Sequence, residues 1–157
     1  MRKTLLLLVM LSLAGCQPYS AHNEKTDEVK AAFGEWIEDV NHKDMHKLLS
    51  LYDEHADLHP TLSGKLRTSS SEIEDYFMHF LALSKLHAET SASHIQVFDD
   101  VAINDGFYVF SFEESGKPKV LKARYSFTYL KEANGWKIID HHSSVVPNEA
   151  KHNATKE

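Results

Sequence analysis

The stretch from Leu121 to Pro147 constrains the fold more than any other, because it has the pattern of two strands joined by a tight turn. Its first run is rich in aromatic and β-branched residues and alternates in character, which is typical of a half-buried strand. One face of that strand is expected to carry Ala123, Tyr125, Phe127 and Tyr129. Asn134 and Gly135 then predict the turn, since both residues tolerate a positive φ. The chain is therefore expected to close with an antiparallel hairpin.

The returning run of this hairpin holds the densest set of polar and ionisable side chains. Period-two geometry predicts that one of its faces carries Trp136, Ile138, Asp140, His142 and Ser144. The adjacent His141 and His142 then point to opposite faces, so only one of them can share a cavity with Arg124 from the preceding strand. We favour His142 for that position. The alternative is that Arg124 is a solvated charge and that both histidines pack structurally.

The first fifteen residues have the pattern of a signal peptide. Arg2 and Lys3 form a basic start, an apolar run follows over residues 5–13, and small residues precede Cys16, which is the only cysteine. The Leu-Ala-Gly-Cys sequence ending at Cys16 resembles the bacterial lipoprotein lipobox, which implies removal of residues 1–15 and lipid attachment to Cys16. Gln17 does not resemble an inner-membrane retention signal, so the implied location is the outer membrane, facing the periplasm. An ordinary secretory signal with a free cysteine nearby is the alternative.

The remainder of the chain predicts one folded domain. Residues 16–25 contain the modified cysteine and a polar tether, residues 26–147 the domain, and residues 148–157 a flexible tail. The sequence has 23 acidic and 17 basic residues, and loss of the signal peptide removes basic residues only. This acidic balance argues against a nucleic-acid-binding surface, which needs a basic stripe.

Helices are predicted before most of the strands. The first begins near Thr26, and a second, short helix is capped by Asp44. A third opens at Ser69 or Ser71, each followed three residues later by glutamate. The apolar stripe of the first helix is Val29, Phe33, Trp36, Ile37 and Val40. After His87 the chain becomes a meander of strands, with a bulge expected over residues 104–106. This order predicts an α+β fold, with helices packed on one face of a strongly curved antiparallel sheet.

A short strand over residues 53–61, ended by Pro60, separates the second and third helices. On strand spacing His55, Asp57 and His59 share one face, and such a trio could hold zinc. No second cluster at ligand spacing supports a zinc site, so we predict no metal. The sequence has no Gly-rich nucleotide loop, so we also predict no cofactor.

Several short blocks occur together along the chain. They are Leu51-Tyr52, Leu58 to Leu62, Ile73, Tyr76-Phe77, Phe80-Leu81, Ala123 to Phe127, Gly135-Trp136 and His141 to Ser144. In these blocks the sequence resembles the nuclear transport factor 2-like superfamily over residues 28–147. Within it, the chain is most similar to SnoaL-like proteins and to bacterial relatives of the calcium/calmodulin-dependent protein kinase II association domain.

The resemblance implies a cone, in which a bent sheet wraps around a pocket and the long first helix closes one side. Family members commonly dimerise through the sheet, so a homodimer is expected. In the kinase association domain an arginine on the penultimate strand lines the deep cavity, and Arg124 falls at the similar position. No kinase portion is present in this sequence.

These observations favour a domain that binds a small polar or anionic molecule, is dimeric and does not catalyse a reaction. The expected ligand-binding residues are Arg124, His142, Tyr52, His59, Thr61 and Tyr108. One alternative is an isomerase-type or dehydratase-type enzyme, with Asp57, His59 or His142 as its base. Another is a structural oligomerisation module, which predicts a filled core instead of a polar pocket.

Overall fold

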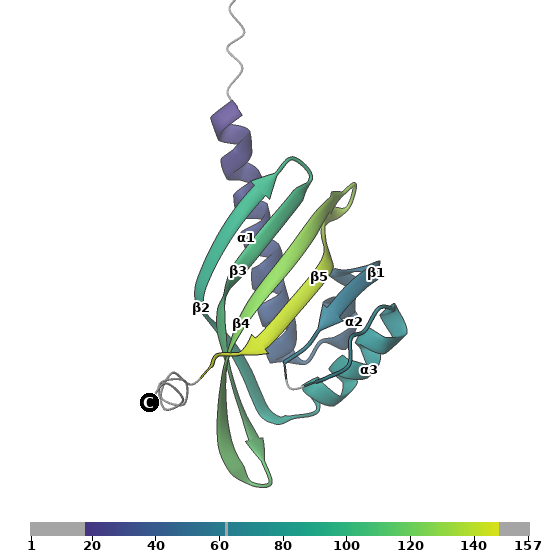
Figure 1. Cartoon of the computed structure of the whole chain (residues 1–157), viewed down its shortest axis with the longest axis vertical. Helices are drawn as coiled ribbons and strands as arrows, with labels where there is room; N and C mark the ends of the chain where they lie inside the picture. Colours follow the sequence, from purple (N-terminus) through teal and green to yellow (C-terminus); the bar gives the residue numbers. More distant parts are fainter. Residues whose placement is uncertain (1–17, 62, 148–157) are drawn as a thin grey trace, which may run out of the picture.

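The computed structural model describes residues 18–61 and 63–147 (Figure 1). The elements are α1 (Pro18–His42), α2 (Met45–Ser50), β1 (Tyr52–His59), α3 (Ser70–Leu81), β2 (Ser84–Phe98), β3 (Val101–Glu114), β4 (Lys117–Glu132) and β5 (Gly135–Val145). Their order confirms the α+β class predicted from the sequence. The predicted signal peptide, Cys16 and the tail from residue 148 lie outside the described residues.

The strands form one sheet in the order β1-β5-β4-β3-β2. Strands β2 to β5 are an antiparallel meander, and β1 lies beside β5 and runs parallel to it, with Leu58 opposite His141. Figure 1 shows this strongly twisted sheet against one side of α1, with α2 and α3 near the β1 edge. The predicted turn joins β4 to β5, with Gly135 at φ +127°.

Helix α1 buries the apolar stripe predicted from its sequence. Val29, Phe33, Trp36 and Val40 are all buried, and the ring of Phe33 lies 5.3 Å from that of Phe127 on β4. The helix begins at Pro18, eight residues before the predicted start. Residues 18–25 have no apolar periodicity to indicate a helix, yet proline fits a first helical turn because its missing N–H needs no partner there.

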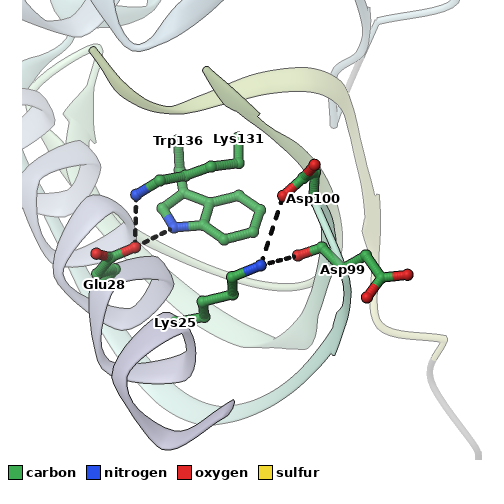
Figure 2. Close-up of polar contacts among 6 residues, drawn as sticks. All are labelled: Lys25, Glu28, Asp99, Asp100, Lys131 and Trp136. Atoms are coloured by element: carbon green, nitrogen blue, oxygen red, sulfur yellow. Dashed lines mark hydrogen bonds and ion pairs between the residues drawn. The ribbon is translucent and has the colours of Figure 1, made fainter. Parts of the chain in front are cut away.

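Polar contacts fix the early turns of α1 to two loops at the same end of the sheet (Figure 2). Lys25 Nζ donates to the carbonyl of Asp99, at 2.7 Å, in the β2–β3 turn. Glu28 Oε2 accepts from Lys131 Nζ at 2.6 Å and from Trp136 Nε1 at 2.8 Å. These hydrogen bonds, first that from Lys131, lower the pKa of Glu28. The β2–β3 turn and the adjoining ends of β4 and β5 are therefore fixed to the helix through Lys25 and Glu28.

A β-bulge in β5 changes which of its residues face the core. Thr128 pairs with Asp140, but the next β4 residue, Tyr129, pairs with Ile138, so Ile139 is the extra residue. Trp136 and Ile138 are buried as predicted, and beyond the bulge the buried residues are His141 and Ser143 instead of His142 and Ser144. The prediction that inward-facing and outward-facing residues alternate without interruption was therefore wrong for the part of β5 after Ile139.

The short helices begin near their predicted starts. The Asp44 side chain accepts a hydrogen bond from the backbone N–H of Lys47 at 3.1 Å, which confirms its capping role. Ser69 is the N-cap residue of α3 but makes no capping hydrogen bond with its side chain. Glu72 accepts instead from the backbone N–H of Thr68 at 3.1 Å.

Gly106 allows two strands and an aromatic ring to approach closely. The chain over residues 101–114 is one continuous strand, and the irregularity lies in its partner, where Ser91 of β2 is the extra residue. The prediction of a bulge at residues 104–106 was therefore wrong, and the bulge lies on the neighbouring strand, β2. A Cβ atom on Gly106 would lie 2.1 Å from the carbonyl oxygen of Ala92 and 2.5 Å from the hydroxyl of Tyr125. Only glycine fits without a backbone shift.

Gly106→Ala is therefore expected to lower the free energy of unfolding by about 2–4 kcal/mol, because the clash involves a backbone oxygen. Gly34→Ala is the matched control, since a Cβ there meets nothing within 4 Å and alanine favours a helix interior by about 1 kcal/mol. Urea denaturation of both variants measures the difference. Equal stability of the two variants would contradict the packing described at Gly106.

Candidate functional site

A cavity of about 260 Å³ lies between α3, the C-terminal part of α1 and the inner face of the sheet. Most of its wall is aromatic or aliphatic. The apolar lining residues are Trp36, Pro60, Tyr76, Phe77, Phe80, Leu83, Tyr108, Phe110, Phe112 and Leu121. Its polar residues are Thr61, Arg67, Asp75, His79, His141 and Ser143. A concave, mostly apolar space with a few polar groups is the usual form of a small-molecule site.

The floor of this cavity is built around the imidazole of His141. Its Nδ1 lies 2.9 Å from the hydroxyl of Tyr52, which also accepts a hydrogen bond from Trp36 Nε1 at 3.0 Å. Its Nε2 lies 3.4 Å from the hydroxyl of Tyr108. That hydroxyl donates to Ser143 Oγ at 2.5 Å, and Ser143 Oγ is hydrogen-bonded to Thr61 Oγ1. Four elements, α1, β1, β3 and β5, and the loop after β1 contribute to this chain of polar groups.

His141 is held neutral by its surroundings. The Phe127 ring stacks on it with centroids 3.9 Å apart, and Trp36 contacts it edge-on at 5.4 Å. Burial, with a smaller effect of the neighbouring His142, lowers the pKa of His141 from 6.5 to about 3. Both ring nitrogens are already engaged by tyrosine hydroxyls. This imidazole is therefore a structural hydrogen-bonding group and is poorly placed to take a proton from a ligand.

The two tyrosines beside His141 also keep their protons. Tyr52 and Tyr108 are buried, and burial raises the pKa of each phenol well above 10. Each hydroxyl can therefore donate one hydrogen bond and accept others at any ordinary pH. The floor of the cavity carries dipoles and no net charge.

Charged side chains are found at the rim. Arg67 lies over the Tyr76 ring, 5.1 Å from its centroid, and its Nη1 donates to Ser63 Oγ at 2.6 Å. His79 Nδ1 lies 2.7 Å from the carbonyl of Asp75, one turn earlier in α3. The site therefore has a neutral polar floor, an aromatic wall and a charged rim.

The structure brings three of the predicted ligand-binding residues together. Thr61 and Tyr108 line the cavity. Tyr52 lies behind the wall and reaches it only through His141. Whether any of them contacts a ligand stays a prediction, but Tyr52 and Thr61 lie here because β1 runs beside β5.

The other three predicted residues lie on the outer face of the sheet, which corrects their expected placement. Arg124 is exposed because Ala123 and Tyr125, on either side of it, face the core, and its Nε donates to Ser144 Oγ at 2.9 Å. His142 is exposed because the bulge at Ile139 turns His141 inward instead. His59 lies beside His142, with ring centroids 5.6 Å apart. None of these three lines the cavity.

His55, Asp57 and His59 alternate along β1, as their spacing predicts. Over residues 18–61 and 63–147, no group of three His, Cys, Asp or Glu side chains is arranged to hold a metal ion.

Most of the lining residues were not predicted as site residues, and these include His141, Ser143, Trp36 and Arg67. His141 and Ser143 were missed because no residue type in β5 marks the bulge that turns them inward. Trp36 was assigned to the core, and it is buried there as well as lining the cavity. Arg67 was missed because it lies in a polar loop with no pattern that relates it to the cavity. Its position shortly before the helix that carries Tyr76 is the only feature of the sequence that could have suggested it.

A family model identifies the chain by its sequence. The calcium/calmodulin dependent protein kinase II association domain model matches residues 25–147. A search of curated proteins finds no match.

Solved structures resemble the chain over most of its length. A protein from Xanthomonas campestris, provisionally described as an association domain of this kind, is 36% identical, with a TM-score of 0.71 over 77% of this chain and 87% of that one. A Streptomyces avermitilis protein of the NTF2-like family, provisionally described as a dehydratase, is 15% identical, with a TM-score of 0.74 over 80% and 99%. An NTF2-like superfamily protein from Salmonella enterica is 16% identical, with a TM-score of 0.73 over 80% and 94%. The last two show a shared NTF2-like fold, the fold predicted from the sequence.

The low pKa of His141 predicts acid-sensitive stability. Between pH 6.5 and about 3 the unfolded chain binds a proton at this residue that the folded chain does not. This contribution to stability is fully present above pH 6.5 and is lost as the pH falls, by about 1.4 kcal/mol per pH unit. His141→Gln, which cannot titrate, should therefore show a shallower loss of stability between pH 7 and pH 4.

Urea denaturation followed by tryptophan fluorescence at several pH values measures this slope. His55→Gln, at an exposed position, is the control and should keep the wild-type slope. A His141→Gln slope equal to that of the wild type would show that His141 is not held neutral.

Proposed function

Because the chain belongs to the calcium/calmodulin dependent protein kinase II association domain family, we propose that it is a non-catalytic binding domain for a small molecule with a flat apolar body and a polar or anionic group. The observation that carries this proposal is the cavity itself. Its wall is aromatic, and its polar groups are confined to the floor and the rim. Such an arrangement favours a ligand whose polar groups lie at its ends.

The state of His141 supports binding over base catalysis. A general base needs a free lone pair and a pKa near the working pH. Here both nitrogens face tyrosine hydroxyls, and the pKa lies at about 3. The neighbouring histidine, His142, lies on the outer face of the sheet. NTF2-like relatives include proteins provisionally described as a dehydratase and as an aromatic ring hydroxylase, but at 14–15% identity they share the fold alone.

Arg67 is the cationic group best placed for an anionic ligand. Its Nη1 is engaged with Ser63 and with the carbonyl of Lys65. Among the described residues, no hydrogen bond involves its Nη2 or Nε, so three N–H donors of the guanidinium, two on Nη2 and one on Nε, are left for a carboxylate. We assign to Arg67 the role that the sequence suggested for Arg124. A role for Arg124 in ligand binding stays a prediction without support from its position.

A variant that fills the cavity tests this proposal. Leu83 follows α3 and lines the cavity, so Leu83→Trp should lower the affinity for the probe 2-naphthoate at least tenfold by occupying its space. Leu66→Trp, at an exposed position outside the lining, is the matched control and should bind as the wild type does. Isothermal titration of the chain from Gln17 onward, which contains every described helix and strand, measures both. Absence of saturable binding, or equal affinity of the Leu83→Trp variant, would refute the proposed binding function.

We also propose that the domain is anchored to the bacterial cell envelope by lipid on Cys16, facing the periplasm from the outer membrane. The support is the Leu-Ala-Gly-Cys sequence after a basic and apolar segment. Within the described part of the chain, no helix is long and apolar enough to cross a membrane. A homodimer, which the family resemblance implies, stays a prediction.

Cys16→Ser should abolish anchoring, because the acyl chains are attached to this sulfur. Expression with radiolabelled palmitate in a bacterial host, followed by fractionation, measures it. The wild type is expected to carry label in the outer-membrane fraction, and the Cys16→Ser variant none. Label that persists in the variant, or its absence from the wild type, would contradict the proposed anchor.

A further inference from the structure

Six polar side chains form one continuous hydrogen-bonded chain that begins in the core and ends at the cavity. In order they are Trp36, Tyr52, His141, Tyr108, Ser143 and Thr61. Thr61 and Ser143, which line the cavity together with Trp36, Tyr108 and His141, are 9% and 6% exposed. Because these groups are buried, the orientation of each hydrogen is set by its neighbours in the chain.

Trp36 fixes the direction of the chain. An indole N–H can only donate, so the Tyr52 hydroxyl accepts from it and directs its own hydrogen to His141 Nδ1. A neutral imidazole whose Nδ1 accepts must carry its hydrogen on Nε2. That hydrogen is directed to the Tyr108 hydroxyl, which in turn donates to Ser143.

One hydrogen is then left over at the cavity end. Six groups carry one polar hydrogen each, and five links join them. If Ser143 donates to Thr61, the surplus hydrogen is on Thr61; if Thr61 donates to Ser143, it is on Ser143. Both hydroxyls line the cavity, so the floor has one unmatched donor in either case.

From this count we propose that the cavity selects ligands that place a carbonyl or carboxylate oxygen on its floor, against the hydroxyls of Thr61 and Ser143. The inference rests on the proposed binding function and adds the chemical class of the group that is recognised. A ligand with an apolar end there leaves a buried donor without a partner, which is costly. The specificity is set from the core side, because Trp36 fixes the direction of every link as far as Ser143.

Two probes of the same shape test this selection. 2-Acetylnaphthalene carries a carbonyl oxygen where 2-isopropenylnaphthalene carries a methylene group, so they differ in the acceptor. The ratio of their dissociation constants is measured for the wild type and for the double variant Thr61→Val, Ser143→Ala. Removal of both hydroxyls is expected to reduce the preference for the ketone about tenfold, because the surplus hydrogen then lies on Tyr108, one link back along the chain from an oxygen placed against residues 61 and 143. Thr68→Val with Ser84→Ala, at exposed positions, is the control pair and should keep the wild-type ratio.

A spectroscopic measurement on the wild type keeps the test independent of how well the double variant folds. The carbonyl stretch of bound 2-acetylnaphthalene should shift to lower frequency than in an apolar solvent, because its oxygen accepts a hydrogen bond. Thr61→Val alone leaves the surplus hydrogen on Ser143, which also lines the cavity, so a shift to lower frequency should persist in that variant.

The outcomes separate this inference from the proposed function. If both probes bind but the carbonyl stretch is unshifted and the ratio is the same in the double variant, the inference is overturned and the binding function stands. If neither probe binds to the wild type while 2-naphthoate does, the inference is likewise overturned. If none of the three binds, the proposed function fails, and the inference fails with it.

Discussion

The burial of one neutral imidazole is the interaction on which the rest of the structure depends. His141 can lie in an aromatic cage only because a tyrosine hydroxyl meets each of its nitrogens. Tyr52 comes from β1 and Tyr108 from β3, so the parallel β1–β5 pairing and the curvature of the meander are both needed to bring them there. Trp36 on α1 completes the arrangement, which ties the helix layer to the sheet through a polar contact inside the apolar core.

This arrangement also explains why the floor of the cavity is polar but uncharged. The sheet supplies hydroxyls and the imidazole at the floor, whereas α3 supplies aromatic rings along the wall and Arg67 stands at the rim. Since the floor groups are all neutral, they can orient a ligand through hydrogen bonds without attracting water as an ion would. The geometry therefore suits recognition of a molecule by its ends better than transfer of a proton.

Much of the fold follows from local patterns, and the site does so only in part. The Asn134–Gly135 turn, the buried face of β4, the stripe of α1 and the Asp44 cap are each determined by residues close in sequence, so they were predictable. The facing of His141 depends on the bulge at Ile139, which is set by pairing with β4 and has no residue signature of its own. Because of this one extra residue, His141 faces the cavity and His142 faces outward, whereas the sequence predicted His142 in the cavity. The need for glycine at position 106 likewise depends on the pairing of β2 with β3, because the carbonyl oxygen of Ala92, next to the Ser91 bulge, leaves no room for a Cβ atom there.

The tautomer of His141 is the most direct test of this account. Long-range ¹H–¹⁵N correlation spectra of histidine-labelled protein distinguish a protonated ring nitrogen from a bare one. Among the 11 histidines, one is expected to keep hydrogen on Nε2 and none on Nδ1 from pH 8 to pH 5, and its signals should be absent from the His141→Gln variant. A His141 that carries hydrogen on Nδ1, or that titrates near its ordinary pKa of 6.5, would contradict the buried chain of hydrogen bonds and the donor it presents to the cavity.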